Sequence, residues 1–143
     1  MNTMGDTPPT IRQARAGDVE AIDRLIAGDS EHLLPRTREE IAQLISTAWV
    51  AEREGEIVGC VTLEIYSSKI AEVRSLIVKE GARGQGAGRA LVHAAVSEAL
   101  NRGVHEVLVV TSIPEFFQEL GFGPCLNEKY ALFWTSGKPE PVS

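Results

Sequence analysis

Most of the information in this sequence lies in residues 76–91, which read Leu76-Ile77-Val78-Lys79-Glu80-Gly81-Ala82-Arg83-Gly84-Gln85-Gly86-Ala87-Gly88-Arg89-Ala90-Leu91. The first three residues form a continuous apolar run, as expected of a strand that is covered on both faces. Glycines then recur at close spacing, and the residues from about Gly88 to Arg102 are rich in Ala, Leu and Val. The pattern predicts a strand, a glycine-rich loop and a helix that Gly103 ends.

The glycine-rich loop is suited to binding a phosphate or pyrophosphate. Gly84, Gly86 and Gly88 permit tight turns and let a ligand approach the backbone closely. The first N–H groups of the following helix have no intrahelical acceptor, and the helix dipole adds positive potential at the same place. The glycine spacing fits neither a Walker loop nor the dinucleotide fingerprint. An ordinary connecting loop is the alternative interpretation.

Composition places the chain among compact proteins of one domain. Of its 143 residues, 43% are hydrophobic and 24% charged, which suits a single domain with its own core. The net charge of −6 argues against a nucleic-acid partner. No apolar run approaches the ~20 residues of a membrane span, and Cys60 and Cys125 form no metal-binding pattern. We expect a cytoplasmic protein with no metal, no membrane partner, a domain over residues 10–135, and flexible tails at 1–9 and 136–143.

The remaining segments predict a mixed α/β order with early hairpins rather than a regular βαβ alternation. Asp18 as an N-cap, and capping boxes at Thr37–Glu40 and Ser112–Glu115, indicate where helices begin. Glu54-Gly55 marks a tight turn between two strands. The expected strands are Thr10–Ala14, Trp49–Glu52, Ile57–Tyr66, Ile70–Val78, Glu106–Val110 and Ala131–Trp134.

Two segments together resemble the GNAT acetyltransferases. The spacing Arg83-x-x-Gly86-x-Gly88, directly after a Leu-x-Val strand end, resembles the coenzyme A pyrophosphate motif of that superfamily. Val107–Val110, followed by Phe116-Phe117-Gln118-Glu119-Leu120-Gly121-Phe122, is similar to the family's next strand and its aromatic helix. Both segments occur in the family's order and separation, and the resemblance extends over roughly Thr10–Trp134.

The resemblance implies an α/β (α+β) fold with a mixed, mostly antiparallel central sheet, splayed central strands and about four flanking helices. It implies acetyl-CoA as the cosubstrate, with its pantetheine arm paired to backbone groups of Leu76, Ile77 and Val78. The other cofactor-binding residues that it implies are Arg83, Gly84, Gln85, Gly86, Ala87, Gly88, Arg89 and Phe117. Many members have, at the position of Phe117, a tyrosine whose hydroxyl protonates the leaving thiolate. Phenylalanine has no hydroxyl, so Tyr130 is the alternative donor here. Dimers are common in the superfamily, so a homodimer is expected.

Three segments resemble the acetyltransferase domain of N-acetylglutamate synthases, especially the short bacterial forms: Leu33–Ile41, Glu72–Leu76, and Val110-Thr111 with Phe116–Phe122. The resemblance implies a small amino acid as acceptor, L-glutamate above all, in a step of arginine biosynthesis. It implies that Arg36 binds a carboxylate, which the guanidinium fork matches in shape and charge. Glu72 would lie near the amine, and Arg74 and Thr111 would be further substrate contacts.

Each of these four residues has a structural alternative. Arg36 stands beside a predicted helix start, where it would otherwise be a solvated surface residue. Arg74 lies within a predicted strand and would otherwise pair with Glu64 or Glu72 across the sheet. In the second case Glu72 would be a structural partner of Arg74. Thr111 would otherwise be an ordinary hydroxyl at a strand end.

The mechanism that we expect is direct transfer. Glu72 removes a proton from the acceptor ammonium through a water molecule, and the free amine attacks the thioester carbonyl. A strand amide near Leu76–Val78 stabilises the oxyanion. The coenzyme thiol has a pKa of about 8.5, so its thiolate leaves without an obligatory acid. The alternatives are acetylation of another small amine or a peptide N-terminus, and a non-catalytic module that binds acetyl-CoA.

Overall fold

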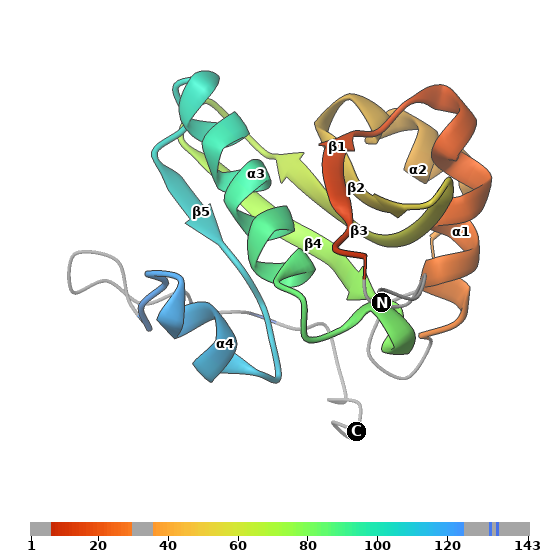
Figure 1. Ribbon diagram of the computed structural model, residues 1–143. Helices are drawn as coiled ribbons and strands as arrows, with labels where there is room; N and C mark the ends of the chain where they lie inside the picture. The colour runs from red at the N-terminus through yellow and green to blue at the C-terminus, as the bar shows by residue number, and fades with distance from the viewer. Residues whose placement is uncertain (1–6, 30–35, 125–131, 133, 135–143) are drawn as a thin grey trace. The chain divides into compact units, whose positions relative to one another are not determined.

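The computed structural model describes residues 7–29, 36–124, 132 and 134. The chain divides into two compact units, Met1–Val110 and Thr111–Ser143. The first unit contains a five-stranded sheet whose strands neighbour one another in chain order (Figure 1). The strands are β1 (Thr10–Gln13), β2 (Ala48–Arg53), β3 (Glu56–Ile65), β4 (Ile70–Val78) and β5 (Glu106–Leu108). All pairs are antiparallel except β4 and β5, which confirms the expected mixed, mostly antiparallel sheet.

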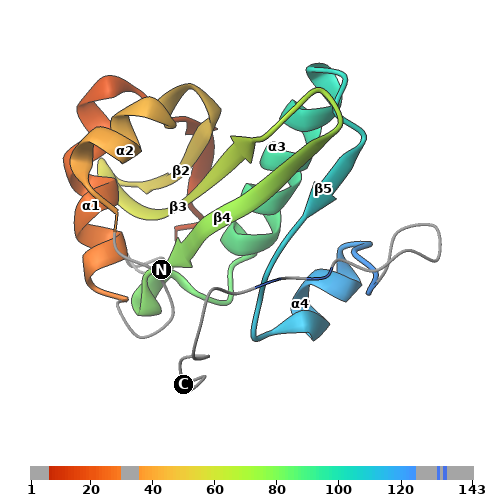
Figure 2. The same cartoon turned by 180° about the vertical axis from the view of Figure 1, so that it is seen from behind.

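Helices cover both faces of this sheet. α3 (Ala87–Asn101) packs against β2, β3 and β4 on one face (Figure 1), and α1 (Val19–Ala27) packs against β3 on the other, with α2 (Arg38–Gln43) beside it (Figure 2). Short 3-10 segments are Ala16–Asp18, Ile45–Thr47 and Glu80–Ala82. α4 (Pro114–Glu119) belongs to the second unit. The four α-helices within the described residues match the expected number.

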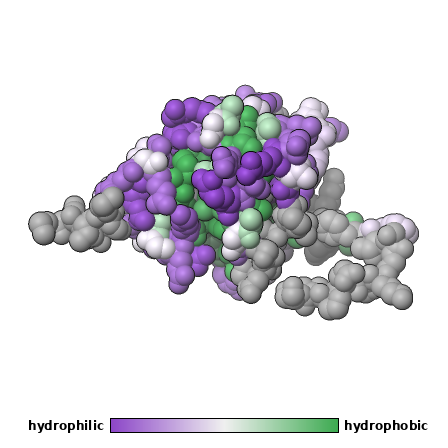
Figure 3. All heavy atoms as spheres, turned by 90° about the vertical axis from the view of Figure 1, so that its right-hand side faces the viewer, coloured by the Kyte–Doolittle hydropathy of each residue, from purple (hydrophilic) through white to green (hydrophobic). Residues whose placement is uncertain are grey.

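The core on the α1 side is built from aliphatic side chains of α1, α2 and the sheet. Its fully or nearly fully buried members include Ile22, Leu25, Ile26, Ile41, Val50, Cys60 and Ile77. On the side of the molecule that carries α1 and α2, apolar side chains gather centrally and hydrophilic ones surround them (Figure 3). Within the described residues, no helix combines the length and the apolar character that crossing a membrane requires.

Two local signals in the sequence are confirmed. The capping box at the start of α2 is present, because Thr37 Oγ1 accepts from the Glu40 N–H at 3.1 Å and Glu40 Oε1 accepts from the Thr37 N–H at 3.1 Å. Glu54 and Gly55 both have positive φ, 52° and 82°, which is the geometry of the tight turns that join antiparallel strands. Both features depend only on neighbouring residues.

Other boundaries differ from the prediction. β5 ends at Leu108 instead of Val110, because its ladder with β4 spans only three residue pairs. Ser112 does not cap α4; the Thr111 hydroxyl accepts from the Ile113 N–H at 2.9 Å, and Pro114 opens the helix. The strand expected at Ala131–Trp134 and the two tails fall largely outside the described residues, as do Cys125 and Tyr130.

Asp18 stands before α1 as expected, but its carboxylate does not cap that helix. It accepts two hydrogen bonds from the Arg12 guanidinium of β1, at 2.8 and 3.0 Å, and one from the Arg15 N–H at 2.7 Å. The hydrogen bonds from Arg12, the largest cause, and from the Arg15 N–H hold the pKa of Asp18 below its ordinary value. The carboxylate therefore ties β1 to the start of α1.

Replacing Asp18 with asparagine is expected to destabilise the fold by about 2 kcal/mol at neutral pH, because charge-assisted hydrogen bonds are lost from a mostly buried site. A lowered folded-state pKa contributes stability above the unfolded value of 3.8, and this contribution is lost as pH falls through the folded value. Urea unfolding should therefore show a large difference between wild type and Asp18→Asn at pH 7 and a smaller one near pH 3. An equal difference at both pH values would contradict this assignment.

Candidate functional site

The glycine-rich loop has the backbone geometry that its sequence predicts. Gly84 and Gly86 adopt left-handed conformations with φ of 86° and 80°, and α3 begins directly afterwards at Ala87. Because the helix begins there, the N–H groups of its first turn have no intrahelical acceptor. The structure thus brings together a strand end, a tight loop and a 15-residue helix that starts at the loop.

The predicted cofactor residues of this loop differ in exposure. Arg83, Gly84, Gly86 and Arg89 are exposed, Gln85 and Gly88 are half-buried, and Ala87 is buried. Arg83 donates from Nε to the Val78 carbonyl at 2.9 Å. This hydrogen bond ties the loop back to the end of β4.

The parallel strands β4 and β5 part soon after they meet. Their ladder runs only from Ile70↔Glu106 to Glu72↔Leu108, whereas β4 continues to Val78. In Figures 1 and 2 the two ribbons diverge beyond this point. Among the described residues of the first unit, the edge of β4 at Leu76–Val78 therefore has no strand paired to it on the β5 side, which agrees with the expected splay.

A bulge interrupts the other edge of β4, just before Leu76. The register with β3 shifts between Cys60 and Thr62, and Ser75 adopts a positive φ of 54°. Side chains of β3 replace the interrupted ladder: Thr62 Oγ1 donates to the Arg74 carbonyl at 3.0 Å, and Cys60 Sγ donates to the Ser75 carbonyl at 3.4 Å. Serine has no strong preference for left-handed backbone, so the sequence gives no signal for this bulge.

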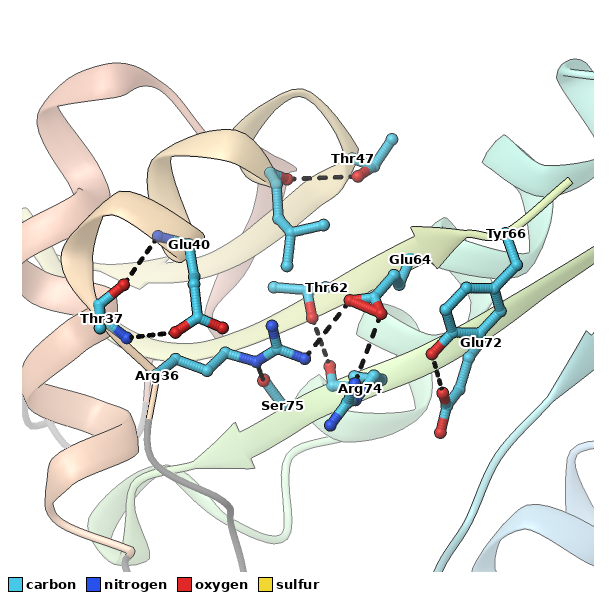
Figure 4. A network of polar contacts seen from close by, with 11 residues as sticks. Arg36, Thr37, Glu40, Thr47, Thr62, Glu64, Tyr66, Glu72, Arg74 and Ser75 are labelled. Atoms are coloured by element: carbon cyan, nitrogen blue, oxygen red, sulfur yellow. Dashed lines mark hydrogen bonds and ion pairs between the residues drawn. The ribbon is translucent and has the colours of Figure 1, made fainter. Parts of the chain in front are cut away.

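Arg36 lies within a partly buried polar network on one face of β3 and β4 (Figure 4). Its side chain is only 7% exposed, which excludes the solvated alternative. Nε donates to Ser75 Oγ at 3.2 Å, and Nη2 lies 3.7 Å from Glu64 Oε1. Among the described residues, Nη2 has no hydrogen-bond acceptor. A buried guanidinium nitrogen without an acceptor is costly, so this atom is suited to an anionic ligand.

Glu64 joins Arg36 to Arg74. Its Oε2 accepts from Arg74 Nη1 at 3.4 Å, while its Oε1 faces Arg36. The structural alternative for Arg74, a pair with Glu64, is therefore present. The network holds two guanidinium groups and places one carboxylate between them.

Glu72 accepts a hydrogen bond from the Tyr66 hydroxyl at 2.5 Å and is half-buried. Partial burial and the neighbouring carboxylates of Glu72 and Glu64 raise the pKa of Tyr66 above its ordinary value. Sequence reasoning missed Tyr66 and Ser75 as members of the site. The sequence did hold a signal for Tyr66. Polar side chains alternate along both strands, as Glu64-x-Tyr66 before the turn and as Glu72-x-Arg74 after it, and such positions share one face of a sheet.

Thr111 and Phe117 belong to the second unit. The Thr111 hydroxyl accepts from the Ile113 N–H, so it has a structural role at the start of α4. Phe117 is buried and makes edge-to-face contacts with Phe116 and Phe122.

Cys60 is fully buried, and burial raises its pKa to about 12. It is therefore a neutral thiol at physiological pH and a poor nucleophile. A separate cavity of about 370 Å³ lies between α1 and the β2–β3 turn, lined by Ala21, Arg24, Leu25, Gly55, Glu56, Ile57 and Lys79. It contains none of the predicted site residues.

Comparisons with known proteins agree with this geometry. Residues 19–122 match the model of the acetyltransferase (GNAT) family. The chain is 38% identical over 114 residues to an uncharacterized N-acetyltransferase of Chlorobaculum tepidum, covering 78% of this chain and 74% of that protein. It is 33% identical over 123 residues to an amino-acid acetyltransferase of Mycobacterium tuberculosis, covering 82% and 70%.

A solved structure shares the fold. N-acetylglutamate synthase from Neisseria gonorrhoeae, complexed with coenzyme A and N-acetyl-glutamate, has a TM-score of 0.72 and 28% identity. The match covers 80% of this chain but only 28% of that longer protein. The sheet, the glycine-rich loop and the family match lead to one conclusion: the chain belongs to the acetyltransferase (GNAT) family and is an acetyl-CoA-dependent N-acetyltransferase.

Proposed function

We propose that this chain is an amino-acid N-acetyltransferase that binds the carboxylate of its acceptor at Arg36. The acceptor would be L-glutamate or a close relative such as glutamine or aspartate. With L-glutamate as the acceptor, the reaction is N-acetylglutamate synthesis, a step of arginine biosynthesis. The observation that carries the proposal is the buried Nη2 of Arg36, which lacks a hydrogen-bond acceptor within the described residues. A carboxylate would satisfy it.

The surrounding charges allow a carboxylate to bind there. Nη2 of Arg36 faces Glu64 at 3.7 Å, beyond hydrogen-bond distance, while Arg74 holds the other oxygen of Glu64. When an acceptor carboxylate binds Arg36, Glu64 keeps Arg74 as a counterion, so neither acidic group is left without a partner. The Ser75 hydroxyl fixes Nε and thereby the plane of the guanidinium group.

Acetyl-CoA would bind along the unpaired edge of β4 and at the start of α3. In this proposal the backbone of Leu76–Val78 pairs with the pantetheine arm, and the amides of residues 84–89 bind the pyrophosphate. The left-handed Gly84 and Gly86 support this assignment, because they leave the loop backbone open to a ligand. Arg83, tied to Val78 through Nε, stands beside the loop.

The proposed chemistry is direct transfer. Glu72 removes a proton from the acceptor ammonium through a water molecule, and the amine attacks the thioester carbonyl. A backbone N–H of Leu76–Val78 stabilises the oxyanion, and the coenzyme leaves as a thiolate. The buried, protonated Cys60 argues against an acyl-cysteine intermediate on that thiol. Phe117 has no hydroxyl to protonate the leaving group, and a thiolate does not need one.

Glu72→Gln is expected to lower kcat/KM for the amino acid by about a hundredfold at pH 7, the lower end of the usual contribution of a general base. Part of the loss should be recovered at high pH, where the amine deprotonates without help. The measurement is a pH–rate profile of thiol release, with the KM for acetyl-CoA expected to stay unchanged. An equal loss at every pH would mean that Glu72 has only a structural role.

Thiol release with a panel of acceptors tests the function as a whole. The panel should contain glutamate, glutamine, aspartate, other α-amino acids, polyamines and short peptides. Glutamate, or else glutamine or aspartate, is expected to be the best acceptor. Faster turnover of polyamines or peptides would overturn the amino-acid proposal, and binding of acetyl-CoA without any turnover would favour a non-catalytic module.

A further inference from the structure

Two carboxylates face each other across β3 and β4. Glu64 and Glu72 are directly opposite in the antiparallel register, an arrangement that is destabilising unless the charges are compensated. The structure compensates them differently: Glu64 lies between two guanidinium groups, whereas Glu72 accepts a hydrogen bond from a neutral phenol (Figure 4). Glu72 is therefore held by a hydrogen bond to one of its oxygens, and Arg74 contributes a favourable charge interaction.

The hairpin holds Tyr66 in place for this contact. Tyr66 follows the end of β3, and its N–H donates to the Ile70 carbonyl at 3.0 Å. Ser67 closes the turn, because its N–H donates to the same carbonyl at 3.3 Å and its hydroxyl accepts from the N–H groups of Lys69 and Ile70 at 3.0 and 3.3 Å. The phenol thus approaches Glu72 from a backbone that is itself hydrogen-bonded.

The hydrogen bond involves only one oxygen of the carboxylate. The phenol donates its proton to Oε1 of Glu72, which leaves Oε2 to accept a proton. The other charged groups that interact with this cluster within the described residues are Glu64 and Arg74, with Arg36 and Glu40 beyond them. Partial burial and the carboxylates of Glu72 and Glu64 raise the pKa of Tyr66, so its hydroxyl is a hydrogen-bond donor at neutral pH.

We propose that Tyr66 is a positioning residue: its hydroxyl fixes Oε1 of Glu72 and thereby directs Oε2 toward the water that carries the acceptor's proton. The inference rests on the proposed role of Glu72 as the base. Tyr66 itself neither gains nor loses a proton in this scheme. It acts by fixing the rotamer of the Glu72 carboxylate.

Tyr66→Phe removes only the hydroxyl and is the direct test. The carboxylate of Glu72 loses the hydroxyl that fixes its rotamer, so kcat for the amino acid should fall by about tenfold at pH 7. The KM values for the amino acid and for acetyl-CoA should stay unchanged. An unchanged kcat would overturn the inference.

Ser67→Ala is the matched control, because it disturbs the same turn without touching Glu72. Its kcat should equal that of the wild type. In a Glu72→Gln background, Tyr66→Phe should cause little further loss, whereas losses that multiply would mean that Tyr66 acts independently of Glu72. Thermal midpoints of all variants report whether the fold is intact.

The failure of this inference can be distinguished from the failure of the base assignment. If Glu72→Gln shows its pH-dependent loss but Tyr66→Phe keeps the wild-type kcat, the role of Tyr66 is wrong and that of Glu72 survives. If Glu72→Gln causes an equal loss at every pH, the base assignment is wrong, and the role of Tyr66 falls with it.

Discussion

Gly86→Asp is expected to abolish the rise in thermal midpoint that acetyl-CoA gives the wild-type protein. A ligand that binds only the folded state stabilises it, by about 2.7 kcal/mol at a concentration one hundred times its Kd. Gly86 immediately precedes α3, where an aspartate would place a negative charge and a helix-capping carboxylate in the proposed pyrophosphate position. Scanning fluorimetry with and without acetyl-CoA measures the effect, and activity should disappear with it.

Two further variants separate charge from backbone strain. Gly103 has the same φ of 80° as Gly86, and a Cβ at either position meets nothing within 4 Å, but Gly103 follows the far end of α3. Gly103→Asp should therefore cost similar stability while it retains the shift with acetyl-CoA. Gly88→Asp lies inside the first turn of α3 and should abolish the shift without left-handed strain. An unaltered shift in both Gly86→Asp and Gly88→Asp would remove the pyrophosphate assignment.

Arg36→Ala is expected to lower kcat/KM for the best amino-acid acceptor by about a hundredfold, the cost of losing a desolvated charge partner. The protein carries a net charge of −6, so an acidic acceptor depends on local guanidinium groups for its binding. Acetyl-CoA should still raise the thermal midpoint, because the proposed cofactor contacts lie elsewhere. Steady-state kinetics with glutamate and glutamine give the measurement.

Arg38→Ala is the control for this variant, since Arg38 lies two residues further on, with a 59% exposed side chain that pairs with Asp23. It should leave kcat/KM nearly unchanged. Arg36→Lys should recover only part of the activity, because lysine keeps the charge but lacks the planar fork. Equal losses in Arg36→Ala and Arg38→Ala would indicate a general surface effect instead of a carboxylate site.

Features that depend on neighbouring residues were predictable from the sequence. The capping box at Thr37, the turn at Glu54-Gly55 and the loop before α3 follow from short-range hydrogen bonds and from the conformational freedom of glycine. The mixed sheet followed from the family resemblance, and the structure confirms it. The expected cap at Ser112 was wrong, because α4 begins at Pro114 and Ile113 therefore occupies the N-cap position.

The candidate site was only partly predictable, because its members meet through long-range contacts. Arg36 hydrogen-bonds Ser75, which lies 39 residues away, and the bulge that presents Ser75 arises from the register of β3 against β4. Burial of Arg36 and the hydrogen bond between Tyr66 and Glu72 likewise depend on how α2 and the hairpin pack. Local chemistry determined where the glycine-rich loop forms, whereas strand register decided which oxygen of Glu72 accepts from Tyr66 and which nitrogens of Arg36 face Ser75 and Glu64.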